Sequence, residues 1–294
     1  MGQNSLRRLA GELKNFLLEQ DEDEFIIPAA APTTAAAAGV SRASEPQAME
    51  EGSTLRVDFP RARQTQPAPQ PSQPVQPPEE TPLMTTAQKK AALTELAETI
   101  KQCSRCALGA TRLNAVPGEG NVDAELMFVG EGPGYDEDRQ GRPFVGRAGQ
   151  LLDKMIVAMG LTREQVFIAN IAKCHPMVDP LHPEKHGNDR APNAGEIACC
   201  RKFLEQQIAI ICPKYIVALG GVSAKALISD AKSLGALRGQ FYNLQLDNVT
   251  LPRPVKILAT FHPAALLRNP NWKKDAWKDL RMVMAELGLK GPAK

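Results

Sequence analysis

Four short apolar runs recur in the last two thirds of the chain, and stretches with helical periodicity separate them. The runs span residues 126–129, 166–169, 215–219 and 255–260. Continuous apolar runs of this length are typical of parallel strands that are buried on both faces. Strands that alternate with helices predict an α/β domain with three αβα layers, in which helices cover a central, mainly parallel, four-stranded sheet.

The N-terminal part differs from this domain in composition. Residues 28–84 hold an alanine run and a tract rich in proline and glutamine, which bury too little apolar surface to offset the entropy of ordering. We therefore predict a disordered linker there and a folded domain over residues 85–289. Within residues 1–27, leucines and a phenylalanine recur at helical spacing and predict an amphipathic helix over residues 5–20. This helix is a candidate docking site for a protein partner, and a helix that frays in isolation is an equal alternative.

Composition adds weaker constraints. The 294-residue chain has a formal net charge of +2, which hides an acidic N-terminal part and a moderately basic folded domain. A basic domain is expected of a protein that touches phosphate backbones, although ordinary enzymes show the same balance. The sequence shows no signal-peptide pattern and no apolar run long enough to cross a membrane. We expect a soluble, cytoplasmic protein.

Small and polar residues follow the predicted strands. Gly132, Asn170, Gly220 and His262 each come just after a strand end. Because the carboxyl ends of parallel strands meet at one edge of a sheet, we expect these residues to build one pocket. Each of them alone has a structural explanation, such as capping a turn or reversing the chain. Their convergence favours a functional site.

The loop after the first strand, residues 130–149, is the first candidate for the active site. Its glycines lack the spacing of phosphate-binding loops, and its carboxylates, Glu131 and Glu137 among them, disfavour a phosphate. Glycine backbone lets a flat ring approach closely, and Phe144 is placed to stack on such a ring. The loop therefore predicts a site for an uncharged ring, and a simple tight turn is the alternative.

Six cysteines in a chain without an export signal favour metal binding over disulfides. Cys103 and Cys106 have the spacing of a shared ligand or redox pair. Two further ligands would come from the other four cysteines, which are Cys174, Cys199, Cys200 and Cys212. Four thiolates suit structural zinc or an iron–sulfur cluster, and spacing does not decide between them. Cys212 and one of the adjacent pair are expected to be plain buried thiols.

Five motifs make the domain similar to the family 4 uracil-DNA glycosylases, the iron–sulfur branch of the uracil glycosylase superfamily. They are CSRC at residues 103–106, GEGPG at 130–134, GRPFVGRAG at 141–149, NIAKC at 170–174 and HPAALLR at 262–268. The resemblance covers about residues 85–289, and its motifs together are highly specific. It implies a monomer that removes uracil from single- or double-stranded DNA by hydrolysing the N-glycosidic bond of a flipped-out nucleotide, which starts base excision repair. A cluster-bearing module that reads a base without hydrolysis is the rival hypothesis.

The resemblance also implies roles for single residues. Cys103, Cys106, Cys174 and Cys200 would hold a structural [4Fe–4S] cluster, with Cys199 as the spare thiol. Phe144 would stack on the extruded uracil. Asn170 would bond O4 and N3–H, a pairing that cytosine cannot satisfy, and His262 would bond O2 as charge builds on the departing base.

The resemblance also bears on the exclusion of thymine, on the activation of the attacking water and on contact with DNA. Glu137 resembles the residue that blocks the thymine methyl group. Gly132 stands where better-known uracil glycosylases place an aspartate, so Glu131 is the nearest candidate to activate water, and the activator stays unassigned. Leu266 and Leu267, beside Arg268, are candidates for an apolar wedge in DNA. Packing under the last helix is the alternative for the two leucines.

Overall fold

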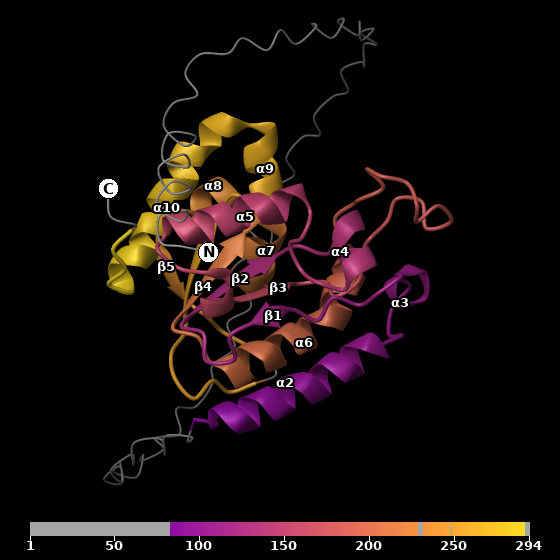
Figure 1. The fold of residues 1–294 in the computed structure, drawn as a ribbon, viewed down its shortest axis with the longest axis horizontal. Coiled ribbons are helices and arrows are strands. Elements are labelled where there is room, and N and C mark those ends of the chain that lie inside the picture. Colours follow the sequence, from indigo (N-terminus) through magenta and orange to yellow (C-terminus); the bar gives the residue numbers. More distant parts are fainter. Residues whose placement is uncertain (1–82, 229–231, 248, 292–294) are drawn as a thin grey trace, which may run out of the picture. The chain divides into compact units, whose positions relative to one another are not determined.

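The computed structural model describes residues 83–228, 232–247 and 249–291. The predicted N-terminal helix and nearly all of the predicted linker lie outside these residues. The described part is built around a six-stranded sheet with the strand order β1-β3-β2-β4-β6-β5 (Figure 1). Among the described residues, no helix combines the length and the apolar character needed to cross a membrane.

The centre of the sheet consists of four parallel strands, which lie on the four predicted runs. They are β3 (Phe167–Asn170), β2 (Leu126–Gly130), β4 (Tyr215–Leu219) and β6 (Lys256–Thr260). Antiparallel edge strands extend it, namely β1 (Glu119–Gly120) beside β3 and β5 (Phe241–Asn243) beside β6. The predicted count of four strands therefore holds for the parallel centre and omits two short edges.

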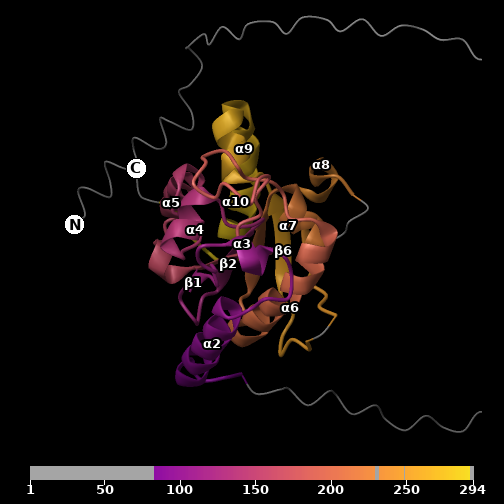
Figure 2. The same ribbon diagram turned by 90° about the vertical axis from the view of Figure 1, so that its right-hand side faces the viewer.

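Helices cover both faces of this sheet (Figure 2). One face carries α5 (Arg147–Ala158), α9 (Pro263–Arg268) and α10 (Lys273–Glu286), and the other carries α6 (Ala194–Ile211), α7 (Gly220–Leu227) and α8 (Leu234–Leu237). Successive side chains of a strand point to opposite faces. Phe128 of β2 therefore packs in the α5 and α10 cluster, while Met127 and Val129 pack in the α6 and α7 cluster. Burial on both faces explains why the strands read as continuous apolar runs.

The helix ends follow local side-chain chemistry. α2 (Thr86–Lys101) begins at a capping box of Thr85 and Gln88, and it packs on α6. α6 begins at a second capping box, because the Asn193 side chain accepts from the backbone N–H of Glu196 and the Glu196 carboxylate accepts from that of Asn193. The remaining short elements are α3 (Leu108–Thr111), α4 (Tyr135–Gln140), η1 (Arg163–Gln165) and η2 (Pro270–Trp272).

Candidate active site

A cavity of about 420 Å³ lies where the parallel strands end. Residues from three strand exits line it: Glu131 after β2, Asn170 at the end of β3, and His262 after β6. Seven of the predicted site residues line this cavity, namely Glu131, Gly132, Glu137, Phe144, Asn170, His262 and Arg268. The convergence expected from the sequence is therefore present.

The fourth strand exit does not reach the cavity. Gly220, after β4, is absent from the lining residues, and it lies against the back of His262 instead. A Cβ atom at Gly220 would come within 3.0 Å of the His262 Cβ, and the backbone has a φ of +90°. Gly220 thus supports a pocket residue and is not one itself, which corrects the expectation from its position in the sequence.

Asn170 presents an acceptor without a partner. The residue is 2% exposed, and its Oδ1 atom has no hydrogen-bond partner among the described residues. A buried polar atom left unpaired costs about 1–3 kcal/mol, so the native fold rarely keeps one without a ligand to bond it. The backbone of Asn170 is held firmly, because the buried Lys173 donates its Nζ to the Asn170 carbonyl at 2.9 Å and to Gln207 Oε1 at 2.6 Å. Asn170 therefore offers a fixed, unsatisfied amide to the cavity.

Phe144 closes the cavity beside this amide. Its backbone has a φ of 52°, a left-handed conformation that costs a non-glycine residue about 1–2 kcal/mol. Arg163 Nη1 donates to the Phe144 carbonyl at 3.3 Å and Arg163 Nη2 donates to the Pro143 carbonyl, so the strained turn is held from behind. The Phe144 ring lies 5.5 Å from the His262 ring, with 32° between their planes. The arrangement leaves an aromatic wall beside an amide and an imidazole.

Gly130 makes room for both walls. A Cβ atom at Gly130 would lie 2.4 Å from Asn170 Oδ1 and 2.4 Å from Phe144 Cζ. Contacts this short do not occur in folded proteins, so any side chain at this position would displace the amide, the aromatic ring or both. The backbone φ of Gly130 is one that any residue can adopt in a strand. Glycine is therefore required here by lack of space for a side chain and not by backbone conformation.

His262 is a neutral hydrogen-bond donor. Burial, followed by the charge of Arg268, lowers the pKa of His262 from 6.5 to about 4. Its Nδ1 atom accepts from the backbone N–H of Ala264 at 3.2 Å. In a neutral imidazole only one ring nitrogen carries a proton, so this bond places the proton on Nε2. His262 therefore has an Nε2–H group to donate to a ligand.

The two predicted glutamates have different environments. Glu137 accepts from the backbone N–H groups of Gly134 at 3.1 Å, Val145 at 2.8 Å and Gly146 at 2.9 Å, which ties the glycine loop to the loop that carries Phe144. Glu131 has no such bonds, and burial raises its pKa, with Arg268 acting in the opposite sense. Glu137 therefore fixes the two loops at the rim, whereas the carboxylate of Glu131 is not held by such bonds.

The predicted wedge residues separate into two groups. Leu266 is 1% exposed and belongs to the apolar cluster under α5 and α10, so the packing alternative holds for this residue and the wedge assignment is wrong for it. Helical periodicity in α9 turns Leu266 inward and Leu267 outward. Leu267 is 38% exposed, and Arg268 lines the cavity. Of the three predicted wedge residues, Leu267 and Arg268 therefore remain candidates to contact DNA.

Five cysteines line a second, much smaller cavity, next to the C-terminal end of α2. They are Cys103, Cys106, Cys174, Cys199 and Cys200, while Cys212 is buried elsewhere. Burial raises the pKa of the Cys174 thiol to about 11, although Arg112 donates to its sulfur at 2.9 Å. Cys199 is only partly buried and its Sγ bonds the Arg105 carbonyl at 3.7 Å. Within the described ranges, no three His, Cys, Asp or Glu side chains are grouped so that they would hold one metal ion.

Sequence reasoning missed several residues that line the main cavity. Asp189 and Arg190 reach it from the proline-rich loop of residues 173–192, together with Pro176 and Ala191. Arg190 forms a two-point ion pair with Glu196, with distances of 2.8 Å and 2.7 Å. The capping box of Asn193 and Glu196 was the available signal, because it shows that the end of this loop is anchored to α6. Nothing in the spacing showed that the loop reaches the cavity.

Comparisons with known proteins agree with this geometry. The sequence model of the Uracil DNA glycosylase superfamily matches residues 117–281. A type-4 uracil-DNA glycosylase of Pyrobaculum aerophilum is 43% identical over 194 residues, which are 65% of this chain and 92% of that protein. The type-4 enzyme of Thermotoga maritima is 42% identical over 192 residues, 65% of this chain and 88% of that protein. That of Saccharolobus solfataricus is 40% identical over 200 residues, 66% and 86% respectively. A superfamily match over more than half of the chain, and relatives covered over most of their length, show that the chain belongs to the type-4 uracil-DNA glycosylase family.

Proposed function

We propose that this chain removes uracil from DNA by hydrolysing the N-glycosidic bond of a flipped-out deoxyuridine, the first step of base excision repair. The observation that carries the proposal is the unpaired Oδ1 of Asn170, which is buried beside Phe144 and a neutral His262 in one cavity. The names of the relatives support the same activity. An enzyme that acts on C1′ of a stacked nucleotide has to extrude it first, and the cavity is a receptacle for the extruded base.

Asn170 would select uracil by two complementary hydrogen bonds. The N3–H group of uracil donates to Oδ1, and O4 accepts from Nδ2. Cytosine offers an unprotonated N3 and an amino group at the same two positions, so both contacts would be mismatched. A site built to pair a polar group rejects an analogue that leaves its own buried groups unpaired, by about 10⁴-fold or more in the best cases.

His262 and Phe144 would act on the departing base. As the bond between C1′ and N1 breaks, negative charge spreads onto O2, and the Nε2–H of His262 is positioned to donate to it. A neutral donor fixed in advance stabilises developing charge without reorganisation, and removing one such donor typically costs about 10²–10³ in rate. Phe144 would hold the ring in the plane that this donor requires. Leu267 and Arg268 would face the DNA beside the extruded nucleotide.

The cysteines fit an iron–sulfur cluster better than a single metal ion. In a cubane cluster each thiolate binds a different iron, so four sulfurs can share a cavity without any three of them converging on one point. Five cysteines line the second cavity. We assign Cys103, Cys106, Cys174 and Cys200 to the [4Fe–4S] cluster and leave out Cys199, because its sulfur bonds the Arg105 carbonyl. The cluster would tie the end of α2, the segment after β3 and α6 together.

Several other expectations stay predictions. They are a monomeric state, a cytoplasmic location, a glycosylase domain over residues 85–289, a disordered linker over residues 28–84 and a protein partner for residues 5–20. The DNA substrate is expected to be single- or double-stranded.

The activity is tested with an oligonucleotide that contains one uracil, by chromatography of the free base. We expect release of uracil and an intact abasic strand. A protein that binds this DNA and releases no base is the rival module and would overturn the proposal.

The cluster is tested by elemental analysis of the purified protein, where about four irons per chain are expected. A purified protein that contains one zinc per chain and no iron would contradict the cluster assignment. Cys200→Ser should lose the iron, whereas Cys199→Ser should keep it, so the pair is a matched test of which adjacent thiol is the ligand.

A further inference from the structure

Four carboxyl groups line the cavity and are candidates to assist the hydrolysis. They belong to Glu131, Asp136, Glu137 and Asp189. Water that attacks C1′ has to lose a proton, and the sugar carries positive charge while the bond to the base breaks. Gly132, where an aspartate was expected, supplies neither function. These four side chains are therefore the carboxylates that could accept the proton of the attacking water.

Hydrogen bonds distinguish these four carboxyl groups. Both oxygens of Glu137 are taken by backbone N–H groups of its own rim. The carboxylate of Glu131 accepts no hydrogen bond from the described residues. That of Asp136 accepts none from them either. Catalytic groups need to be held in place, because a misplacement of about 1 Å can cost a hundredfold in rate.

Asp189 is held where the others are not. Its Oδ1 lies 2.6 Å from Nε2 of His175, and the backbone N–H of Tyr135 also bonds its carboxylate. The same oxygen packs over the glycine loop, 3.5 Å from where a Cβ of Gly134 would stand. The side chain is nevertheless 55% exposed and lines the cavity, so it keeps lone pairs for a ligand. These bonds also hold the pKa of Asp189 below its ordinary value.

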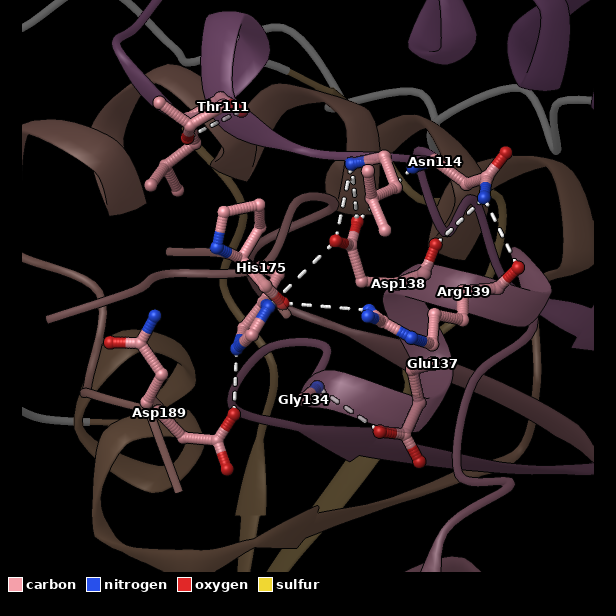
Figure 3. Close-up of polar contacts among 12 residues, drawn as sticks. Thr111, Asn114, Gly134, Glu137, Asp138, Arg139, His175 and Asp189 are labelled. Atoms are coloured by element: carbon pink, nitrogen blue, oxygen red, sulfur yellow. Dashed lines mark hydrogen bonds and ion pairs between the residues drawn. The ribbon is translucent and has the colours of Figure 1, made fainter. Parts of the chain in front are cut away.

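The histidine behind Asp189 is itself anchored (Figure 3). His175 is 1% exposed, and its Nδ1 lies 3.8 Å from Oδ2 of Asp138. Asp138 accepts from the backbone N–H of Leu113 at 3.0 Å and 3.1 Å, and from that of Asn114 at 3.1 Å. A carboxylate, an imidazole and a second carboxylate thus form a line from the backbone of residues 113–114 to the cavity. Asp138, at 3.8 Å, is an ion-pair neighbour of His175, and the 2.6 Å hydrogen bond from His175 orients Asp189.

We propose that Asp189 is the catalytic carboxylate of the base-release reaction, positioned by His175 to accept a proton from the attacking water and to face the positive charge on the sugar. The inference rests on the proposed function. In the step, the C1′–N1 bond breaks and its electron pair leaves with uracil, whose O2 is bonded by His262. The water oxygen forms the new bond to C1′, and one water proton passes to Asp189 and then to solvent. Uracil takes a proton from solvent.

The test compares single-turnover rates of uracil release for variants of the full-length, iron-loaded protein. Asp189→Asn keeps an acceptor for His175 and removes the basic oxygen, so we expect the rate to fall by about 100-fold. Affinity for DNA that carries non-cleavable 2′-fluorinated deoxyuridine should stay at the parent value. Formate, a small carboxylate, should restore part of the rate of Asp189→Ala, because it can occupy the vacated space.

Two matched variants make the result specific. Asp179→Asn makes the same chemical change in the same loop, where Asp179 pairs with Lys185 and does not line the cavity, and it should retain the parent rate. Asp136→Asn tests the remaining free carboxylate of the cavity, and a loss of rate in this variant alone would overturn the assignment to Asp189. So would an Asp189→Asn variant that releases uracil at the parent rate, or an Asp189→Ala variant that loses DNA affinity and gains nothing from formate. A parent protein that releases no uracil would instead overturn the proposed function together with this inference.

Discussion

At the scale of single residues, the amide of Asn170 would distinguish uracil, which has a hydrogen-bond donor at N3, from cytosine, which has an acceptor there. Asn170→Asp keeps the shape of the side chain, removes the donor to O4 and adds a negative charge. We expect uracil excision to fall by about a hundredfold or more, and any residual activity to shift towards cytosine, whose amino group gains an acceptor. The measurement is single-turnover release from matched oligonucleotides that contain uracil or cytosine opposite guanine. An intact, iron-loaded variant that removes uracil at the parent rate would show that Asn170 does not read the base.

His262 and His175 respond to pH in opposite directions. The pKa of His262 is lowered to about 4 in the folded protein. Between pH 6.5 and 4 this histidine is therefore protonated in the unfolded chain and neutral in the folded chain. Stability from His262 is therefore lost as the pH falls from 6.5 towards 4. Burial acts to lower the pKa of His175, but the neighbouring carboxylates of Asp138 and Asp189 raise it to about 9. Its contribution is present below pH 6.5 and is lost as the pH rises through 9.

The lowered pKa of His262 gives a prediction for the stability of the His262→Gln variant. The variant should gain stability relative to the parent as the pH falls from 6.5 to 4, because it lacks the group that must stay uncharged. Melting temperatures of both proteins across this range check the prediction. His182→Gln, a change at an exposed histidine of the loop after β3, is the control and should track the parent. A constant difference between parent and His262→Gln at all pH values would contradict the prediction.

At the scale of elements, the end of β2 determines whether two walls of the cavity fit together. Gly130→Ala puts a methyl group 2.4 Å from both Asn170 Oδ1 and Phe144 Cζ, so one of the walls has to move. We expect excision to fall by about a hundredfold and the free energy of unfolding to fall by about 1–3 kcal/mol. Kinetics and chemical denaturation measure the two effects. Gly221→Ala is the control, because a Cβ there meets nothing within 4 Å, and it should resemble the parent. Equal effects of the two changes would contradict this account of the packing.

The same elements show what the sequence can and cannot predict. The parallel strands are predictable because burial on both faces leaves an uninterrupted apolar run, as in residues 215–219. The edge strands β1 and β5 are too short to carry a pattern. Asn170 and His262 are predictable because they end strands that share an edge. Asp189 is not, because its position depends on a hydrogen bond to His175, and His175 in turn lies beside Asp138.

At the scale of the whole molecule, the described residues begin at 83, close to the end of the predicted linker. The first described helix begins at the capping box of Thr85 and packs on α6. We expect deletion of residues 1–82 to leave uracil release nearly unchanged, because a proline- and glutamine-rich segment has little apolar surface to pack on the domain. Release rates and melting temperatures of the truncated and full-length proteins measure this. Loss of soluble activity on truncation would refute it, and a change in recruitment alone would point to a partner for residues 5–20.

The cavity is assembled from segments that the ribosome makes at very different times. The glycine loop, Phe144 and Asn170 are synthesised early in the domain, whereas β6, His262 and Arg268 come late. A parallel sheet needs its central strands paired before their ends can meet, and β4 can be flanked on both sides only when β6 has emerged. A growing chain therefore holds no leaving-group donor and no closed receptacle until translation is nearly finished. A chain that ends between β4 and β6 would therefore lack His262 and Arg268, whatever the state of the earlier strands.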